Sequence, residues 1–70
     1  MDTNFYTRDG KILKNLNDLI NYLKETSEEN FQYHKEHFYK WLIDVFGDCK
    51  NALKVKRAKN KEDALIKLKN

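Results

Sequence analysis

Residues 31–46, FQYHKEHFYKWLIDVF, constrain the fold of this chain more than any other stretch. They contain five of the eight Phe and Tyr side chains and the only tryptophan. Large residues recur here at spacings of three and four, which places them on one face of an α-helix. A chain of 70 residues buries only about 60% of the surface that it exposes when unfolded, so its other elements must pack against this face. The face consists of Phe31, His34, Phe38, Trp41, Leu42, Val45 and Phe46.

A β-hairpin is predicted at the N-terminal end, over residues 4–13. Two short β-forming arms, residues 5–7 and 11–13, flank Arg8-Asp9-Gly10. An Asp-Gly pair between such arms favours a tight turn, because glycine adopts a positive φ without strain. An isolated two-stranded hairpin is marginally stable in water. We therefore expect it to pack on the helices through Phe5, Ile12 and Leu13.

Four helices are predicted after the hairpin. Asn15, Ser27, Asp48 and Asn60 each precede an amphipathic segment and can act as N-caps. Gly47 predicts a left-handed C-cap for the aromatic helix. The helical periodicity continues through the two histidines, so we predict no break there. The expected helices cover about residues 16–25, 28–46, 49–58 and 61–69.

These elements predict one small, mainly α domain over residues 1–70, with four short helices around a central aromatic-rich helix and a small N-terminal β-hairpin. The predicted core is Phe5, Ile12, Leu16, Leu19, Ile20, Leu23, Phe31, Phe38, Trp41, Leu42, Val45, Phe46 and Leu65.

Cys49 is the only cysteine, which excludes an internal disulfide and fits a reducing, intracellular setting. The N-terminal sequence has no apolar segment of the kind that signal peptides carry, and no run approaches the roughly 18 apolar residues of a membrane-spanning helix. We predict a cytoplasmic protein that contacts no membrane.

The charge is divided unevenly along the chain. Residues 1–48 carry six basic and nine acidic side chains, whereas residues 49–70 carry eight basic and two acidic ones, giving balances of −3 and +6. A basic helical face can contact several phosphates of a nucleic acid, although a lysine-rich composition would also produce a merely solvated face. The candidate contacts are Lys50, Lys54, Lys56, Arg57, Lys59 and Lys61.

Tyrosines outnumber the inward positions that helical spacing provides. Tyr22, Tyr33 and Tyr39 lie beside the apolar stripes, and exposed tyrosines of this kind favour a protein interface because they combine a large contact area with a polar tip. Oligomerisation is also a usual source of stability at this length. We therefore expect a homodimer or a protein partner.

The sequence offers little catalytic or metal-binding chemistry. His34 and His37 share a helix face and could bind a metal together with Glu36, Asp44, Asp48 or Cys49, but no zinc signature accompanies them. Cys49 at a helix start could be a reactive thiol, yet Asp48 opposes thiolate formation. The prediction is no enzyme, no cofactor and no metal, with a site at His34, His37 and Cys49 as a remote alternative.

The order of Gly10, a Leu-rich first helix, Phe31, His34, Phe38, Trp41 and Asp44-Val45-Phe46-Gly47-Asp48 resembles a small family of archaeal domains of unknown function. The resemblance extends from about Phe5 to Ala64. It departs from the family at Glu36 and His37, where an Asn-Asp pair is usual. It implies an archaeal, cytoplasmic setting and no particular activity.

The leading functional hypothesis is a non-enzymatic interaction module that forms a homodimer and binds a protein partner. The alternative is a basic protein that binds nucleic acid or ribonucleoprotein through its C-terminal lysine-rich face.

Overall fold

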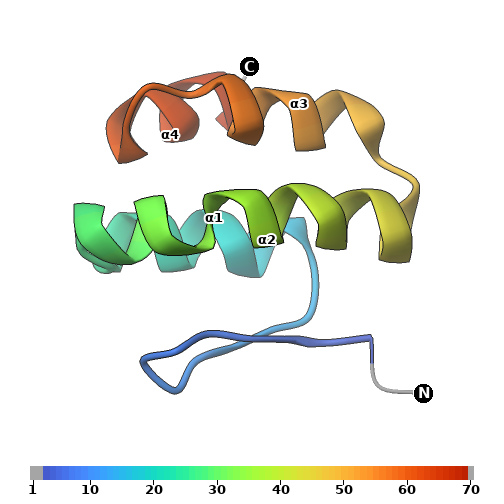
Figure 1. The fold of residues 1–70 in the computed structure, drawn as a ribbon, viewed down its shortest axis with the longest axis horizontal. Coiled ribbons are helices and arrows are strands. Elements are labelled where there is room, and N and C mark those ends of the chain that lie inside the picture. Colours follow the sequence, from blue (N-terminus) through green and yellow to red (C-terminus); the bar gives the residue numbers. More distant parts are fainter. Residues whose placement is uncertain (1–2, 70) are drawn as a thin grey trace.

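The computed structural model describes residues 3–69 and confirms the mainly α fold with an N-terminal hairpin. Figure 1 shows three layers: the hairpin, then α1 beside α2, then α3 with α4. The described strands pair as β1–β2, antiparallel. The elements are β1 (Phe5–Tyr6), β2 (Ile12–Leu13), α1 (Leu16–Glu25), α2 (Glu28–Phe46), α3 (Cys49–Arg57) and α4 (Lys61–Lys69).

The helices begin and end where local capping chemistry predicts. Asn15, Ser27, Asp48 and Asn60 each accept a hydrogen bond from the backbone N–H three residues later, at 2.8–3.2 Å. Gly47 closes α2 in the left-handed conformation, with φ 63°. The aromatic helix is continuous through both histidines, as predicted. Only α3 differs, because it ends one residue before the expected position 58.

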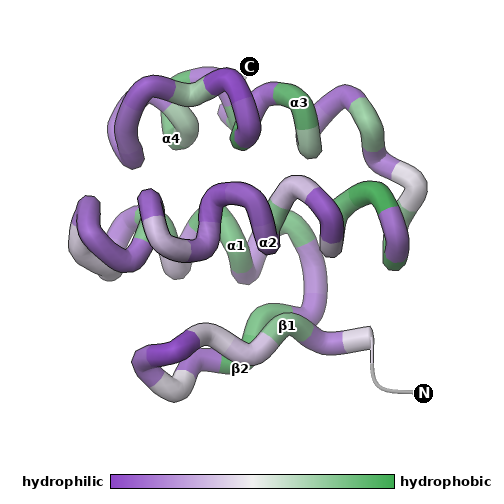
Figure 2. Tube along the Cα trace, viewed as in Figure 1, coloured by the Kyte–Doolittle hydropathy of each residue, from purple (hydrophilic) through white to green (hydrophobic). Residues whose placement is uncertain are grey.

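The core lies where α2 meets the hairpin on one side and α3 on the other. Figure 2 shows that the hairpin, α2 and α3 each contain hydrophobic residues. Phe31, Phe38 and Leu42 of α2 are fully buried. The ring of Phe5 on β1 lies 4.9 Å from that of Phe38 and 5.5 Å from that of Trp41, measured between centroids. The hairpin is thus held to α2 by aromatic contacts, as its marginal intrinsic stability requires.

Two predicted core residues are exposed. The prediction that Ile12 is buried is wrong, because Leu13 takes the inward position of β2 and successive strand residues point to opposite faces. The prediction for Phe46 is wrong because this residue lies in the last turn of α2, where its ring packs against Trp41 but stays 44% exposed. Phe5, Leu16, Ile20 and Val45 are half-buried at the edge of the core. The buried hydrophobic residues omitted from the predicted core are Leu13, Tyr22, Ala52, Val55, Ala58, Ala64 and Leu68.

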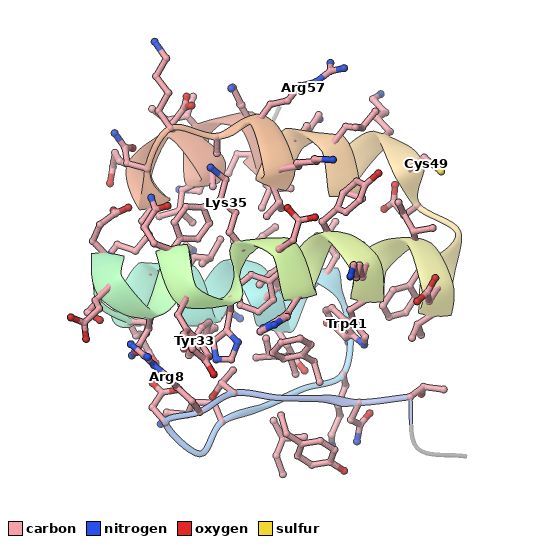
Figure 3. The ribbon with its side chains drawn as sticks, in the orientation of Figure 1. Arg8, Tyr33, Lys35, Trp41, Cys49 and Arg57 are labelled. Atoms are coloured by element: carbon pink, nitrogen blue, oxygen red, sulfur yellow. The ribbon has the colours of Figure 1, made fainter. Side chains whose placement is uncertain are left out.

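Two lysines join the layers by donating hydrogen bonds to the ends of other helices. Lys35 projects from α2 toward the upper layer (Figure 3), and its Nζ donates to the carbonyl of Ala58 after α3. Lys61 at the start of α4 donates through Nζ to the carbonyl of Thr26 after α1. Both lysines therefore satisfy carbonyl groups that a helix end leaves without an intrahelical partner.

Candidate functional site

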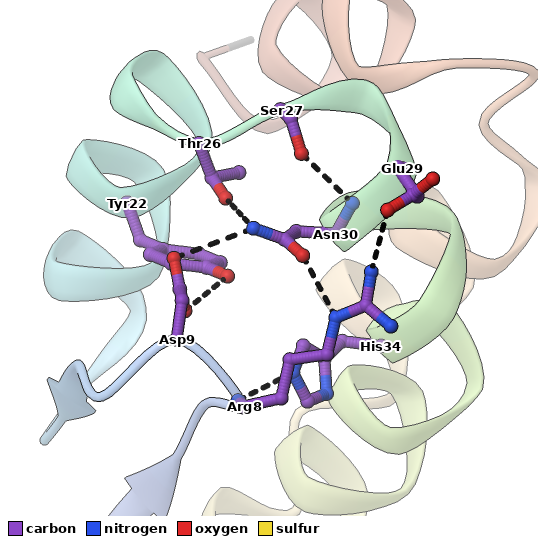
Figure 4. A network of polar contacts seen from close by, with 8 residues as sticks. All are labelled: Arg8, Asp9, Tyr22, Thr26, Ser27, Glu29, Asn30 and His34. Atoms are coloured by element: carbon purple, nitrogen blue, oxygen red, sulfur yellow. Dashed lines mark hydrogen bonds and ion pairs between the residues drawn. The ribbon is translucent and has the colours of Figure 1, made fainter.

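A polar network ties the hairpin turn to α1 and α2 (Figure 4). The guanidinium of Arg8 donates to Asn30 Oδ1 at 2.8 Å and to Glu29 Oε1 at 3.2 Å. It also lies over the ring of Tyr33, with Cζ 4.2 Å from the ring centroid. Because Arg8 and Asn30 are 22 positions apart in the chain, these contacts fix the orientation of the turn relative to α2.

Asp9 accepts hydrogen bonds from three side chains in this network. The donors are the hydroxyls of Thr7 and Tyr22 and the amide of Asn30. The hydrogen bond from Thr7 is the main cause that lowers the pKa of Asp9, since it stabilises the charged form. Tyr22 is buried against Phe38, so the expectation that it is an exposed interface residue is wrong.

His34 is buried beneath the turn and neutral. Its Nε2 accepts the backbone N–H of Arg8 at 3.0 Å, so the proton of the neutral ring belongs on Nδ1. Nδ1 faces Nδ1 of His37 at 3.3 Å. Burial is the main cause that lowers the pKa of His34, with His37 and Arg8 adding to it. The ring is therefore a hydrogen-bonded part of the core. It must be neutral, because Nε2 can accept the Arg8 N–H only when it carries no proton.

The residues of the remote metal or thiol alternative, His34, His37 and Cys49, do not come together in the structure. His34 and His37 adjoin, but about 18 Å of helix separates His34 from the end of α2. Cys49 lies beyond that end, exposed at the start of α3 (Figure 3). Among residues 3–69, no group of three or more His, Cys, Asp or Glu side chains is placed to hold a metal ion.

A groove of about 470 Å³ runs between β2 and α1. Residues 11–14 form one wall. The other wall is a polar face of α1 and its N-cap, made of Asn15, Asp18, Asn21, Tyr22 and Glu25. The groove is open to solvent, and Ile12 exposes 53% of its surface beside it.

The outer edge of β2 faces this groove. The Thr7 N–H donates to the Lys11 carbonyl at 2.9 Å, and Gly10 has φ 87° in the intervening turn. Bonded and non-bonded pairs alternate along an antiparallel ladder, so the next pair, Tyr6 with Ile12, is a non-bonded one. The N–H and C=O of Ile12 consequently point away from β1, toward the position of a third strand.

The basic residues predicted from sequence separate into two groups. Lys50, Lys54 and Arg57 line one hollow of about 420 Å³ on the α3–α4 layer, and Figure 3 shows Arg57 projecting from this layer. Lys67 of α4 also lines it, although the sequence argument did not include that residue. Leu53 supplies the apolar part of the lining.

The other three predicted cations do not line this hollow. Lys56 lies over the ring of Tyr39, with Nζ 4.5 Å from the centroid, which also leaves Tyr39 half-buried. Lys61 caps α1 through its Nζ, as described above. Lys59 lies in the α3–α4 connection, where its N–H donates to Asp63 at 2.9 Å. Helical spacing already places positions 50, 54 and 57 on one face of α3. The structure adds the contacts of the other three lysines, which the spacing does not predict.

Of the three tyrosines predicted at an interface, Tyr33 alone is largely exposed, at 53%. Its ring packs against Arg8 and His34 rather than standing free in solvent. Of the three tyrosines predicted at an interface, the exposed surface is therefore mainly that of Tyr33, next to the hairpin turn.

Comparison with known proteins found no matching family model, no similar curated protein and no similar solved structure. No helix within residues 3–69 has the length and apolar character needed to cross a membrane.

Proposed function

We propose that this protein is a non-enzymatic interaction module that binds an extended segment of a protein partner beside β2. The observation that carries the proposal is the free edge of β2, where the N–H and C=O of Ile12 point into a groove already walled by α1. A strand added at such an edge gains main-chain hydrogen bonds, and pockets for alternate side chains give specificity.

The groove favours a partner segment over a second copy of this chain. Two copies paired through β2 around a two-fold axis would each place an α1 on the same face of the joint sheet. Both helices would then compete for the space above the junction, whereas an extended segment has no covering helix of its own. Self-association through another face stays a prediction, which analytical ultracentrifugation at high protein concentration tests.

The chemistry of the walls defines the expected segment. Lys11 and Lys14 lie immediately before and after β2, so a segment with an acidic residue at each end and an apolar residue between them complements this edge. The backbone N–H of Lys14 donates to Asp18 at 3.0 Å and is therefore already bonded within the protein. Ile12 is thus the residue of this edge whose N–H and C=O both face outward.

The test is a selection of random twelve-residue displayed peptides, followed by NMR titration of the best binder. We expect the largest shifts, and slowed amide exchange, at Ile12. Ile12→Pro removes the outward N–H without touching the β1–β2 ladder, so affinity should fall about tenfold, the equivalent of one hydrogen bond. The control Ile12→Thr keeps the N–H and should lose much less. Shifts confined to α3 and α4, or unchanged binding by Ile12→Pro, would refute strand addition at this edge.

A further inference from the structure

We propose that protonation of His34 releases the hairpin turn from α2 and thereby weakens binding of the extended segment beside β2. The device is a buried ring nitrogen that accepts a backbone N–H of the turn (Figure 4). The ligand is that of the proposed function, on which this regulation rests, but the release of the turn can be measured without a ligand.

The hydrogen bond between the turn and α2 exists only while His34 is neutral. Nε2 of His34 accepts the Arg8 N–H at 3.0 Å, and only 4% of the residue is exposed. A protonated imidazole donates from both nitrogens, so Nε2–H and the Arg8 N–H would face each other at a site closed to most solvent. The turn must move away from the ring to relieve this contact.

The groups of α2 around the ring direct the extra proton to the nitrogen that faces the turn. Nδ1 of His37 lies 3.3 Å from Nδ1 of His34 and accepts the proton that this nitrogen already carries. Tyr33 and Phe38 contact the His34 ring only through their own rings, at 4.8 and 5.5 Å between centroids. The second proton therefore enters on Nε2.

The hairpin brings one cation and one carboxylate to the ring. Phe5 of β1 packs on the ring at 5.3 Å between centroids and carries no charge. Burial, His37 and the Arg8 guanidinium together outweigh the Asp9 carboxylate, so the pKa of His34 is lowered while the turn is in place. The proton consequently binds more tightly once the turn is released, and this difference couples the two events.

The turn moves as one piece with the start of β2. The Thr7 N–H donates to the Lys11 carbonyl at 2.9 Å, and the Gly10 N–H donates to the Thr7 carbonyl at 3.1 Å. These bonds lie within the hairpin and do not depend on His34. Because Ile12 directly follows Lys11, release of the turn displaces the edge of β2 relative to α1.

The groove beside β2 reaches the same polar network. Lys11 and Tyr22 both line the groove, and the Tyr22 hydroxyl donates to Asp9 at 3.0 Å. A bound strand needs β2 and α1 at a fixed separation, since β2 supplies main-chain hydrogen bonds and α1 forms the opposite wall. Binding of the segment and of the proton should therefore oppose each other, each weakening the other by the same factor.

The first measurement is an NMR titration of the free protein from about pH 7.5 to about pH 5, the range in which histidine changes charge. The ring of His34 reports its own protonation, and the amides of Arg8 and Ile12 report the turn and the edge of β2. We expect both amides to shift with the midpoint of the ring, and the Arg8 amide to exchange faster below that midpoint. Amides that stay unchanged through the ring transition would refute the release, with or without a ligand.

The second measurement is the affinity of a histidine-free peptide from the displayed library over the same pH range. One linked proton changes an affinity by at most about tenfold per pH unit, so the affinity should approach this slope below the midpoint of the His34 ring. Constant affinity through that transition would overturn the coupling. If no peptide binds at pH 7.5, the proposed function fails and the coupling with it, whereas the release of the turn still stands or falls with the amides.

Two variants assign the effect to one of the two histidines of the chain. His34→Gln keeps an uncharged acceptor that does not titrate, so its affinity should be the same at both ends of the pH range. The matched control His37→Gln removes the exposed histidine and should keep the fall. Circular dichroism checks that both variants are folded. An equal fall in both would assign the pH dependence to carboxylates of the groove or the peptide and would overturn the role of His34.

Discussion

Trp41 is the residue whose truncation we expect to damage the fold most. It exposes only 8% of its surface, and its ring contacts those of Phe5 and Phe46 at 5.5 and 5.2 Å between centroids. Its indole N–H donates to the Thr3 carbonyl at 2.8 Å. The side chain therefore joins the first described residues of the chain, β1 and the end of α2.

The magnitude follows from these contacts. Burying about 200 Å² of aromatic surface at about 25 cal/mol per Å² contributes about 5 kcal/mol. Aromatic-to-alanine substitutions in other cores cost about 3–5 kcal/mol after the surroundings relax. A 70-residue domain has a total stability of about 3.5–10 kcal/mol. Trp41→Ala should thus remove about 4 kcal/mol, a large part of the whole.

Urea unfolding followed by circular dichroism at 222 nm measures this loss, because the substitution removes the only tryptophan fluorophore. With a urea slope near 1 kcal/mol per M, the midpoint should fall by about 4 M, or the variant should be unfolded in buffer. The control Trp41→Phe keeps an aromatic ring but not the N–H, and should cost about 1–2 kcal/mol. If the midpoint of Trp41→Ala lay within 0.5 M of the wild type (roughly the size of a surface substitution), α2 would not be the centre of this fold.

Two further predictions concern local features. The pKa of His34 is lowered from 6.5 in the fold, so the unfolded state binds more protons; stability should be full above pH 6.5 and fall as the pH drops below it. Urea melts between pH 7.5 and 5 measure this, with His34→Gln expected to flatten the dependence and His37→Gln to keep most of it; an equally steep decline in His34→Gln would assign the effect to other groups. Gly47→Ala should destabilise by about 1 kcal/mol in the same melts, because φ is 63° and an added Cβ meets nothing that compensates the strain. Gly47→Asn should lose less, and an unchanged midpoint for Gly47→Ala would contradict the strain argument.

The helices were predictable because their signals are local. Each N-cap stands beside the segment that it caps, and Gly47 directly follows the last turn of α2. The inward face of α2 was predictable for the same reason, since Phe31, Phe38 and Trp41 follow the helical period.

The errors arose where the outcome depends on a distant partner. Arms of two or three residues contain too little alternation to decide whether Ile12 or Leu13 points inward. Tyr22 is buried against Phe38, and its hydroxyl donates a hydrogen bond to Asp9 on the distant hairpin turn. Lys56, outside the face shared by Lys50, Lys54 and Arg57, contacts the ring of Tyr39 on α2. None of these pairings has a signature in the order of residues.

The lysines that join the layers make the amines of this chain chemically unequal. Lys35 and Lys61 are half-buried and donate to carbonyls at helix ends, whereas Lys24 and Lys40 are exposed on the surface. An acylating reagent reacts with an amine only when its nitrogen is accessible and its lone pair is free. Acylation of Lys35 and Lys61 in the intact protein should therefore be slower than acylation of Lys24 and Lys40, because it requires the loss of a hydrogen bond between layers.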